Sequence, residues 1–259
     1  MKQFCVIGNP IEHSISPKLH NAAYKAFSID AAYTKILLEN GGKLRETLLT
    51  YEGANITVPH KEAAFSVCDK IEGIAAQIEA VNTIVKKNDK LIGFNTDADG
   101  FFEAIKEFGK VENALVLGAG GAAKAIAFIL RQNGIETAIL NRSVERLEFF
   151  RQKGFKSFSW GSFAPKKYDI VINTTTAGLK DNVLPAPAEI LNETLKSARF
   201  GFDAIYNKKT PFLKLCDEFG LKYKDGSDML LYQAVFAFNI FFDNVYDETK
   251  IAQIMKKSL

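Results

Sequence analysis

The stretch Ala114-Leu-Val-Leu-Gly118-Ala-Gly-Gly-Ala-Ala123 decides the fold, because an apolar run ends there in a glycine-rich turn. An apolar helix follows and ends near Asn133-Gly134. Strand, glycine-rich turn and helix in this order are typical of a dinucleotide-binding unit, although such turns also serve as plain connectors. The first glycine permits the tight turn, the second lets backbone approach a pyrophosphate, and the helix N-terminus offers N–H groups to that anion. We therefore expect a dinucleotide to be held by Gly118, Ala119, Gly120, Gly121 and Ala122.

Strands and helices alternate on both sides of this turn, which is the pattern of a parallel sheet. From about Asp99 to Lys224 we expect a single doubly wound sheet, with further strands at Thr137–Leu140, Ile170–Ile172 and Arg199–Phe202. The interpretation is an α/β, Rossmann-type domain, and we place its bounds at 99–231.

The preceding residues predict a second α/β domain over 1–98, which opens with strands at Phe4–Gly8 and Tyr33–Leu37 around a helix at Pro17–Phe27. A strand at Asn55–Val58 and a helix at His60–Lys70 follow. The next apolar runs predict a hairpin, with strands at Val81–Val85 and Leu91–Phe94 and a two-residue loop at Asn88-Asp89. If Lys87 faces Lys90 across that loop, Asn82 falls opposite Asn95.

Composition and charge exclude several classes of protein. The 259 residues are 47% hydrophobic and 24% charged, with a mean hydropathy of −0.04, as in a globular protein. Lys+Arg 33 against Asp+Glu 30 is spread along the chain, so we expect no nucleic-acid partner. The late apolar stretch Met229–Phe242 is too short to span a membrane and predicts a buried helix. Monomer and homodimer are both open.

The start of the chain and the cysteines indicate a compartment. The first ten residues lack the long apolar segment of a secretory signal. Cys5, Cys68 and Cys216 are an odd number without CxxC spacing, which argues against a disulfide framework or a zinc site. We therefore expect a reducing, cytoplasmic location and no metal.

The residues after the next strand bear on the choice of cofactor. An NAD site would place Asp or Glu there for the ribose 2′-hydroxyl, but the chain has Asn141-Arg142-Ser143. Arg142 and Arg146 are four apart at an expected helix start, so they would share a face and clamp a 2′-phosphate. The alternative is a solvated helix turn in which Arg146 pairs with Glu145 or Glu148. Position after the glycine-rich turn favours NADP, bound by Asn141, Arg142, Ser143 and Arg146.

Polar residues gather at the strand ends of the first domain, where open α/β sheets bind ligands. Many hydroxyl and amide groups suit a polyhydroxylated ligand, because an unmet buried hydrogen bond costs about 1–3 kcal/mol. The alternative is turn chemistry, and for Ser14 or Ser16 alone a cap on the helix starting at Pro17 is the commoner role. The hairpin register favours a shared site, because it brings two Asn-Thr pairs together. The residues concerned are Ser14, Ser16, Asn55, Thr57, Asn82, Asn95, Thr96 and Asp97.

Lys61 is the most informative single residue, because it lies in the first turn of a predicted helix, where the macrodipole disfavours a cation. Facing a carboxylate such as Asp97, it would be a proton-transfer partner for a hydroxyl being oxidised. The alternative is an exposed lysine beside Glu62. His60 is expected at the surface, and the histidines show no metal-ligand spacing.

These segments resemble the shikimate dehydrogenase family over almost the whole chain. Val6–Asn21 resembles the family's substrate-binding Ser-x-Ser segment, and Gly53–Glu62 resembles its catalytic-lysine segment. Ala80–Thr83 and Gly93–Asp97 resemble its two Asn-Thr segments, with Asp97 at the catalytic aspartate.

Two later segments extend the resemblance. Asp203–Leu213 implies nicotinamide contact at Ala204 and substrate contact at Tyr206. Asp225–Met229 with Gln233 implies nicotinamide contact at Gly226 and a substrate hydroxyl at Gln233. The chain departs from the family at Ala98 and Asp228, where glycine is usual. The family also implies that the final helices, 232–259, complete the domain of residues 1–98.

The resemblance implies NADPH-dependent, reversible reduction of 3-dehydroshikimate to shikimate in the aromatic amino-acid pathway. Lys61 and Asp97 would handle the proton, with the carrier left open because coupled groups titrate as a pair. Ser14 and Ser16 would bind the substrate carboxylate. One alternative is a quinate/shikimate dehydrogenase with NAD or mixed cofactor use, against which Ser16 and the arginines argue. Another is a catalytically silent NADP-binding regulator, against which Lys61 and Asp97 argue.

Overall fold

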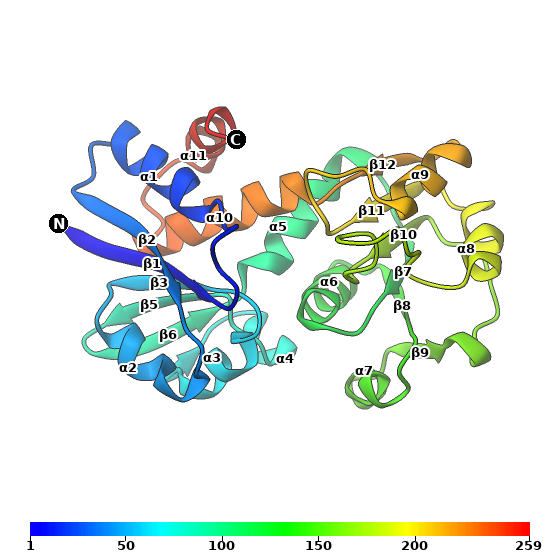
Figure 1. Ribbon diagram of the computed structural model, residues 1–259, viewed down its shortest axis with the longest axis horizontal. Coiled ribbons are helices and arrows are strands. Elements are labelled where there is room, and N and C mark those ends of the chain that lie inside the picture. The colour runs from blue at the N-terminus through cyan, green and yellow to red at the C-terminus, as the bar shows by residue number, and fades with distance from the viewer. The chain divides into compact units, whose positions relative to one another are not determined.

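The computed structural model describes all residues, 1–259, and the chain forms two compact units (Figure 1). Unit 1 comprises Met1–Gly100 and Leu231–Leu259, and unit 2 comprises Phe101–Leu230. The chain passes from one unit to the other within helix α5 (Thr96–Ile105) and returns within helix α10 (Ser227–Phe241).

Unit 1 is built on a six-stranded mixed sheet of order β2-β1-β3-β5-β6-β4. The strand β1 is parallel to β2 and β3, whereas β5 is antiparallel to both of its neighbours, β3 and β6. Helices cover both faces of this sheet, and parts of α5 and α10 also belong to the unit. The bounds of its other strands and helices are β1 (Lys2–Gly8), α1 (Ser16–Ala26), β2 (Ala31–Leu37), η1 (Gly41–Lys43), α2 (Leu44–Leu49), β3 (Gly53–Ile56), α3 (Lys61–Val67), β4 (Lys70–Ile71), α4 (Ala75–Ile78), β5 (Thr83–Lys87), β6 (Lys90–Phe94) and α11 (Glu248–Lys257).

The hairpin of β5 and β6 has the predicted register, with Lys87 opposite Lys90 and Thr83 opposite Phe94. Asn88 and Asp89 both have positive φ, at 51° and 59°, as a type I′ turn requires. Because the twist of this two-residue loop matches the twist of the flanking strands, the loop itself fixes which residues of β5 and β6 pair. The register prediction is confirmed.

Two helix boundaries in unit 1 differ from the sequence prediction. The helix expected over His60–Lys70 ends at Val67, because strand β4 begins at Lys70. From the sequence we place the start of the second domain at 99, but helix α5 already begins at Thr96, where Asn95 Oδ1 accepts the Ala98 N–H at 3.3 Å in the manner of an N-cap. Asp97 therefore lies in the first turn of α5 rather than in a loop.

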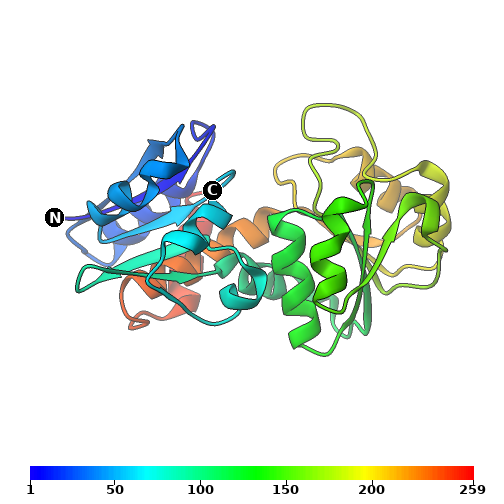
Figure 2. The same cartoon turned by 90° about the horizontal axis from the view of Figure 1, so that it is seen from below.

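The core of unit 1 has two layers of helices around the sheet, as Figures 1 and 2 show. Helices α1, α10 and α11 cover one face, where Leu19, Phe238 and Met255 are fully buried. Helices α2 and α3 cover the other, where Leu44 and Ala64 are fully buried. The late apolar stretch is thus a buried helix, α10, as predicted, and none of the helices is long and apolar enough to cross a membrane.

Unit 2 holds the predicted doubly wound sheet. All neighbouring strands in its order, β12-β11-β10-β7-β8-β9, are parallel, which in chain order is the 3-2-1-4-5-6 arrangement of dinucleotide-binding folds. The prediction of an α/β, Rossmann-type fold is confirmed. Its elements are η2 (Lys106–Phe108), β7 (Asn113–Leu117), α6 (Gly121–Gln132), β8 (Glu136–Asn141), η3 (Glu145–Leu147), α7 (Glu148–Gln152), β9 (Lys156–Ser159), η4 (Trp160–Ser162), β10 (Ile170–Asn173), α8 (Ala188–Leu195), β11 (Phe200–Asp203), α9 (Pro211–Glu218) and β12 (Lys222–Lys224).

Helices cover both faces of this sheet. Figure 1 shows α6 on one side of β7, β8 and β10, with α8 and α9 on the other. The side chains of Leu191 and Phe212 from α8 and α9 are fully buried against Leu115 and Val171 of the sheet. The strand order reverses between β7 and β10, so the carboxyl ends of these two strands form the edge where such folds bind ligands.

Candidate active site

Lys61 and Asp97 meet in unit 1. Lys61 is the first residue of α3 and Asp97 the second residue of α5, and Lys61 Nζ lies 2.6 Å from Asp97 Oδ2. The two side chains are only 20% and 12% exposed. Lys61 is therefore not the solvated lysine of the alternative interpretation, and the pair can hold or release a proton at one point.

The backbone around this pair is fixed by the segment that precedes β5. The Val81 N–H donates to the Lys61 carbonyl at 2.9 Å, and the Thr96 N–H donates to Asn82 Oδ1 at 2.7 Å. Val81 and Asn82 are adjacent, so one short segment holds the first turns of both α3 and α5.

The two Asn-Thr pairs come together as the hairpin register predicts. Asn82 Nδ2 donates to Thr96 Oγ1 at 3.1 Å, and the Thr83 and Thr96 hydroxyls are 3.1 Å apart. Asn95 serves the backbone instead, since its Nδ2 donates to the Ala80 carbonyl at 3.0 Å. Asn82 uses a single N–H of its amide in these bonds.

Asn55 is bound on both sides of its carboxamide. Its Oδ1 accepts the Tyr33 hydroxyl at 2.6 Å, and its Nδ2 donates to Thr83 Oγ1 at 3.0 Å and to the Asn82 carbonyl at 3.2 Å. The sequence had suggested a ligand hydroxyl for this amide. In the structure both of its N–H groups and its oxygen already have protein partners.

Ser14, Ser16 and Thr57 follow β1 and β3 at the same edge of the sheet, because these strands are parallel. Helix α1 begins at Ser16 with Ile15 as its N-cap residue, and Ser14 Oγ accepts the Ser16 N–H at 3.4 Å, so Ser14 bonds the first backbone N–H of the helix. The two serine hydroxyls also lie 3.3 Å apart. Thr57 is half-buried, and its methyl group leaves no room for a side chain at Gly8.

Gln233 lies on α10 in the part that belongs to unit 1. The backbone of α5 at Gly100 approaches it so closely that a Cβ on Gly100 would stand 2.7 Å from the Gln233 nitrogen. Ala98, one of the two departures, is fully buried two residues earlier on α5.

The surface position expected for His60 is wrong. His60 is 5% exposed, and its Nε2 lies 2.6 Å from the Leu38 carbonyl, which places it as the N-cap residue of α3 with its ring inside the unit. No group of three or more His, Cys, Asp or Glu side chains is placed to hold a metal ion.

The glycine-rich turn of unit 2 is open on the side that a phosphate would occupy. Gly118 has φ of +112°, a value that favours glycine, and a Cβ there would stand 2.5 Å from Thr174 Oγ1. Nothing lies within 4 Å of a Cβ on Gly120 or Gly121. Gly120 is the N-cap of α6 without a side-chain hydrogen bond, so the N–H groups of this twelve-residue helix face an open cradle.

The arginines lie beside this turn but not on one helix face. Asn141 ends β8 and its Nδ2 donates to the Ser143 carbonyl at 2.9 Å, which forms a turn and delays the helix until Glu145. The shared-face prediction for Arg142 and Arg146 is therefore wrong. Both side chains are exposed, and the ion pair with Glu145 or Glu148 that the alternative interpretation required does not form.

Ala204, Tyr206 and Gly226 follow β11 and β12 at the same edge of unit 2. The Gly226 N–H donates to the Ile205 carbonyl at 3.0 Å, and a Cβ on Gly226 would stand 2.3 Å from the Ala204 carbonyl oxygen. The two predicted nicotinamide positions are thus packed backbone to backbone. Tyr206 is half-buried, and burial raises the pKa of its hydroxyl.

Asp203 fixes this loop, and sequence reasoning gave it no role. It is fully buried at the end of β11, where it accepts hydrogen bonds from Thr210 Oγ1 at 2.6 Å, Asn173 Nδ2 at 3.1 Å and the Ile205 N–H at 3.0 Å. Burial raises the pKa of Asp203, against the effect of these bonds. An acidic residue that ends an apolar strand was the available signal.

Asp228, the other departure, pairs with Lys224. Lys224 Nζ lies 2.5 Å from Asp228, 3.0 Å from Glu107 and 3.1 Å from the Ala104 carbonyl. Burial acts to lower the pKa of Lys224, and the bonds to Asp228 and Glu107 more than offset it, so the pKa is raised. The carboxylate is therefore taken up by a neighbouring cation.

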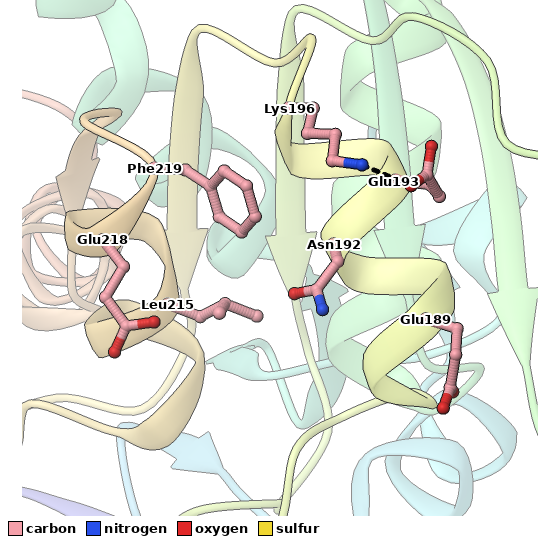
Figure 3. Close-up of a pocket in the computed structure, with 7 residues that line it drawn as sticks. All are labelled: Glu189, Asn192, Glu193, Lys196, Leu215, Glu218 and Phe219. Carbon is pink, nitrogen blue, oxygen red and sulfur yellow. Dashed lines mark hydrogen bonds and ion pairs between the residues drawn. The ribbon is translucent and has the colours of Figure 1, made fainter.

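A separate cleft lies between α8 and α9, as Figure 3 shows. Leu215 and Phe219 form its apolar wall, and Lys196 pairs with Glu193 at 2.5 Å on the opposite side. None of the predicted site residues lines it. The glycine turn and the loops after β11 and β12, at the carboxyl edge of the sheet, remain the candidate site of unit 2.

A Rossmann-type unit with an open glycine turn, in a chain that also carries a buried lysine–carboxylate pair, defines a nucleotide-dependent oxidoreductase. The family model described as the shikimate dehydrogenase substrate binding domain matches residues 6–84. A shikimate dehydrogenase (NADP(+)) of Helicobacter hepaticus is 46% identical, over 99% of this chain and 98% of that protein. The chain belongs to the shikimate dehydrogenase family.

Solved structures agree with this assignment. Shikimate 5-dehydrogenase from Thermus thermophilus, in complex with NADP(H) and shikimate, has a TM-score of 0.86 and 32% identity, with 100% of both chains covered. Ligand-free 5-ketofructose reductase of a Gluconobacter species has a TM-score of 0.82 and 28% identity, with 100% of this chain and 99% of that chain covered. The fold therefore carries more than one reductase.

The glycine turn predicts two different responses to alanine. Gly118→Ala should lower the free energy of unfolding by about 1–3 kcal/mol, because the positive φ is strained for alanine and Thr174 must move. Gly120→Ala is the matched control, because Gly120 has φ of −96° and open space where the alanine Cβ would stand. The free energy of unfolding of this variant should stay within about 1 kcal/mol of wild type. Urea unfolding followed by circular dichroism measures both, and equal losses would contradict the account.

Proposed function

We propose that this protein reduces 3-dehydroshikimate reversibly to shikimate with NADPH. The observation that carries the proposal is the Lys61–Asp97 contact at 2.6 Å, which is largely shielded from solvent at the carboxyl edge of the sheet in unit 1. Membership of the shikimate dehydrogenase family and the name of the relative at 46% identity support the substrate and the cofactor.

The pair supplies the proton of the reaction. The nicotinamide, when bound, supplies or accepts the hydride. In the reduction the Lys61–Asp97 pair gives one proton to the substrate carbonyl oxygen, which becomes a hydroxyl, and in the oxidation it takes that proton back. The net reduction consumes one ketone, one NADPH and one proton, so the pair must afterwards regain its proton from solvent.

We propose the substrate contacts from the chemistry of the side chains. Ser14 and Ser16 would donate hydroxyl hydrogens to the carboxylate, and their mutual spacing of 3.3 Å suits two oxygens of one group. Ring hydroxyls would be held by Thr57, Asn82, Asp97 and Gln233, with Asn55 behind them. Tyr206 is the further substrate contact that the family resemblance implies.

We propose that unit 2 binds NADP. The open space at Gly120 and Gly121 and the uncapped start of α6 fit a pyrophosphate, and Ala119 and Ala122 add no bulk that would block it. Arg142 and Arg146, exposed and without ion-pair partners, fit a 2′-phosphate, with Asn141 and Ser143 shaping the turn. Ala204 and Gly226 would face the nicotinamide. The domain of residues 99–231 would then hold the cofactor, and the domain of residues 1–98, completed by 232–259, would hold most of the substrate contacts.

A four-way assay tests the function directly. Purified protein is offered shikimate or quinate, each with NADP or NAD, and the nicotinamide absorbance gives kcat/KM for each pair. We expect shikimate with NADP to exceed the other three combinations. Activity mainly with quinate or NAD would instead support a quinate/shikimate dehydrogenase, and NADP binding without turnover would support a silent regulator.

Replacing Lys61 separates catalysis from binding. Lys61→Ala should lower kcat with shikimate and NADP by about 100-fold or more, with a smaller change in KM, because proton transfer is lost while the substrate contacts remain. Lys25→Ala, at an exposed position in the last turn of α1, is the control and should keep the wild-type kcat. An unchanged turnover number in Lys61→Ala would rule out its catalytic role.

The arginines predict cofactor choice. Arg142→Ala with Arg146→Ala should raise the KM for NADP by about 100-fold or more and change that for NAD little, because each charge-assisted bond to a phosphate contributes about 1.5–3 kcal/mol and two such bonds are lost. Arg151→Ala, exposed on α7, is the control. Equal weakening of NADP and NAD would show that these side chains do not read the 2′-phosphate.

A further inference from the structure

We propose that Tyr33 is a positioning residue for the Lys61–Asp97 pair and acts through Asn55, an inference that rests on the proposed function. Tyr33 lies on β2, outside every segment to which the sequence assigned chemistry. Its hydroxyl is its link to the site, because it donates to Asn55 Oδ1 at 2.6 Å.

Three neighbours fix Tyr33. The Asn21 side chain bonds both backbone groups of Tyr33, donating to its carbonyl and accepting from its N–H, each at 2.9 Å. The imidazole of His20 stacks on the phenol ring, with centroids 4.3 Å apart and planes 5° from parallel. His20 is fully buried, and burial lowers its pKa to about 3, so the ring stays neutral. The Tyr33 hydroxyl therefore has one well-defined position.

That hydroxyl decides how the Asn55 amide is oriented. With Oδ1 held by Tyr33, Nδ2 must face Thr83 Oγ1 and the Asn82 carbonyl, at 3.0 and 3.2 Å. Thr83 Oγ1 in turn donates to Asn82 Oδ1 at 3.0 Å. All of these atoms are buried, so a turned amide would find no water to replace the lost bonds.

The chain of bonds ends at the Lys61–Asp97 pair. Asn82 Oδ1, reached from Tyr33 through Asn55 and Thr83, accepts the N–H of Thr96, the residue before Asp97. The segment Val81-Asn82 also holds the Lys61 carbonyl. Loss of the Tyr33 hydroxyl would loosen both residues of the pair without removing any group that touches substrate.

Tyr24 provides a matched control. It is as buried as Tyr33, at 2% exposure, its ring also lies beside His20, and its hydroxyl has no hydrogen-bond partner. Tyr24→Phe and Tyr33→Phe therefore remove the same atom from the same core. Only the second removes a hydrogen bond.

The first measurement is steady-state kinetics with shikimate and NADP. We expect Tyr33→Phe to lower kcat about tenfold, which corresponds to about 1.4 kcal/mol in the barrier, and to leave the KM for NADP unchanged. Tyr24→Phe should keep the wild-type kcat. A merely structural tyrosine would lower stability without this split, so equal kcat values in the two folded variants would overturn the proposal.

The second measurement, amide hydrogen exchange by NMR, does not depend on activity. In Tyr33→Phe the Thr96 amide should exchange about tenfold faster than in wild type, and by a clearly larger factor than the Val6 amide in the middle of β1, which reports global opening. Equal acceleration at both amides would indicate global loosening and overturn the proposal, as would an unchanged Thr96 rate. If wild type fails to turn over shikimate, the proposed function fails, and the exchange rates alone decide the role of Tyr33.

Discussion

The carboxamide of Asn82 is the point on which the geometry of unit 1 depends. Its oxygen accepts the Thr96 N–H at 2.7 Å, and the N–H of the preceding residue, Val81, donates to the Lys61 carbonyl at 2.9 Å. Lys61 of α3 and Asp97 of α5 are 36 positions apart in the chain, and the segment Val81-Asn82 holds the first turns of both helices. Because a buried polar group without a partner costs about 1–3 kcal/mol, any shift of one helix start must be matched by the other.

In unit 2 a buried carboxylate, rather than an amide, holds neighbouring segments of the chain in place. Asp203 ends a buried strand and binds Thr210, Asn173 and the Ile205 N–H, so the loops after β10 and β11 share one anchor. Burial raises the pKa of Asp203, which shows that hydrogen bonds only partly offset its loss of hydration. In both units, then, a polar residue is buried at the carboxyl edge of the sheet and holds loops that local sequence preferences leave undefined.

Local patterns predicted the features that neighbouring residues determine. The parallel sheet follows from alternating apolar runs, and the hairpin register follows from a two-residue loop at Asn88-Asp89. The errors occurred where a distant or competing bond decides. Asn141 binds the Ser143 carbonyl and keeps Arg142 off the helix, and His60 is drawn inside by the Leu38 carbonyl. Tyr33 gave no signal, since its partner Asn55 is 22 residues away on another strand.

Asp228 shows how a departure from a family pattern can be absorbed. A carboxylate at this position adds a negative charge five residues before Gln233, but Lys224, four residues earlier at the end of β12, places its ammonium 2.5 Å from Asp228. The same ammonium reaches the Ala104 carbonyl and Glu107, so the new carboxylate joins an existing contact between β12 and the end of α5. Lys224 and Asp228 enclose Gly226, whose backbone packs on Ala204. The Asp228 carboxylate is therefore paired with an ammonium group beside this turn.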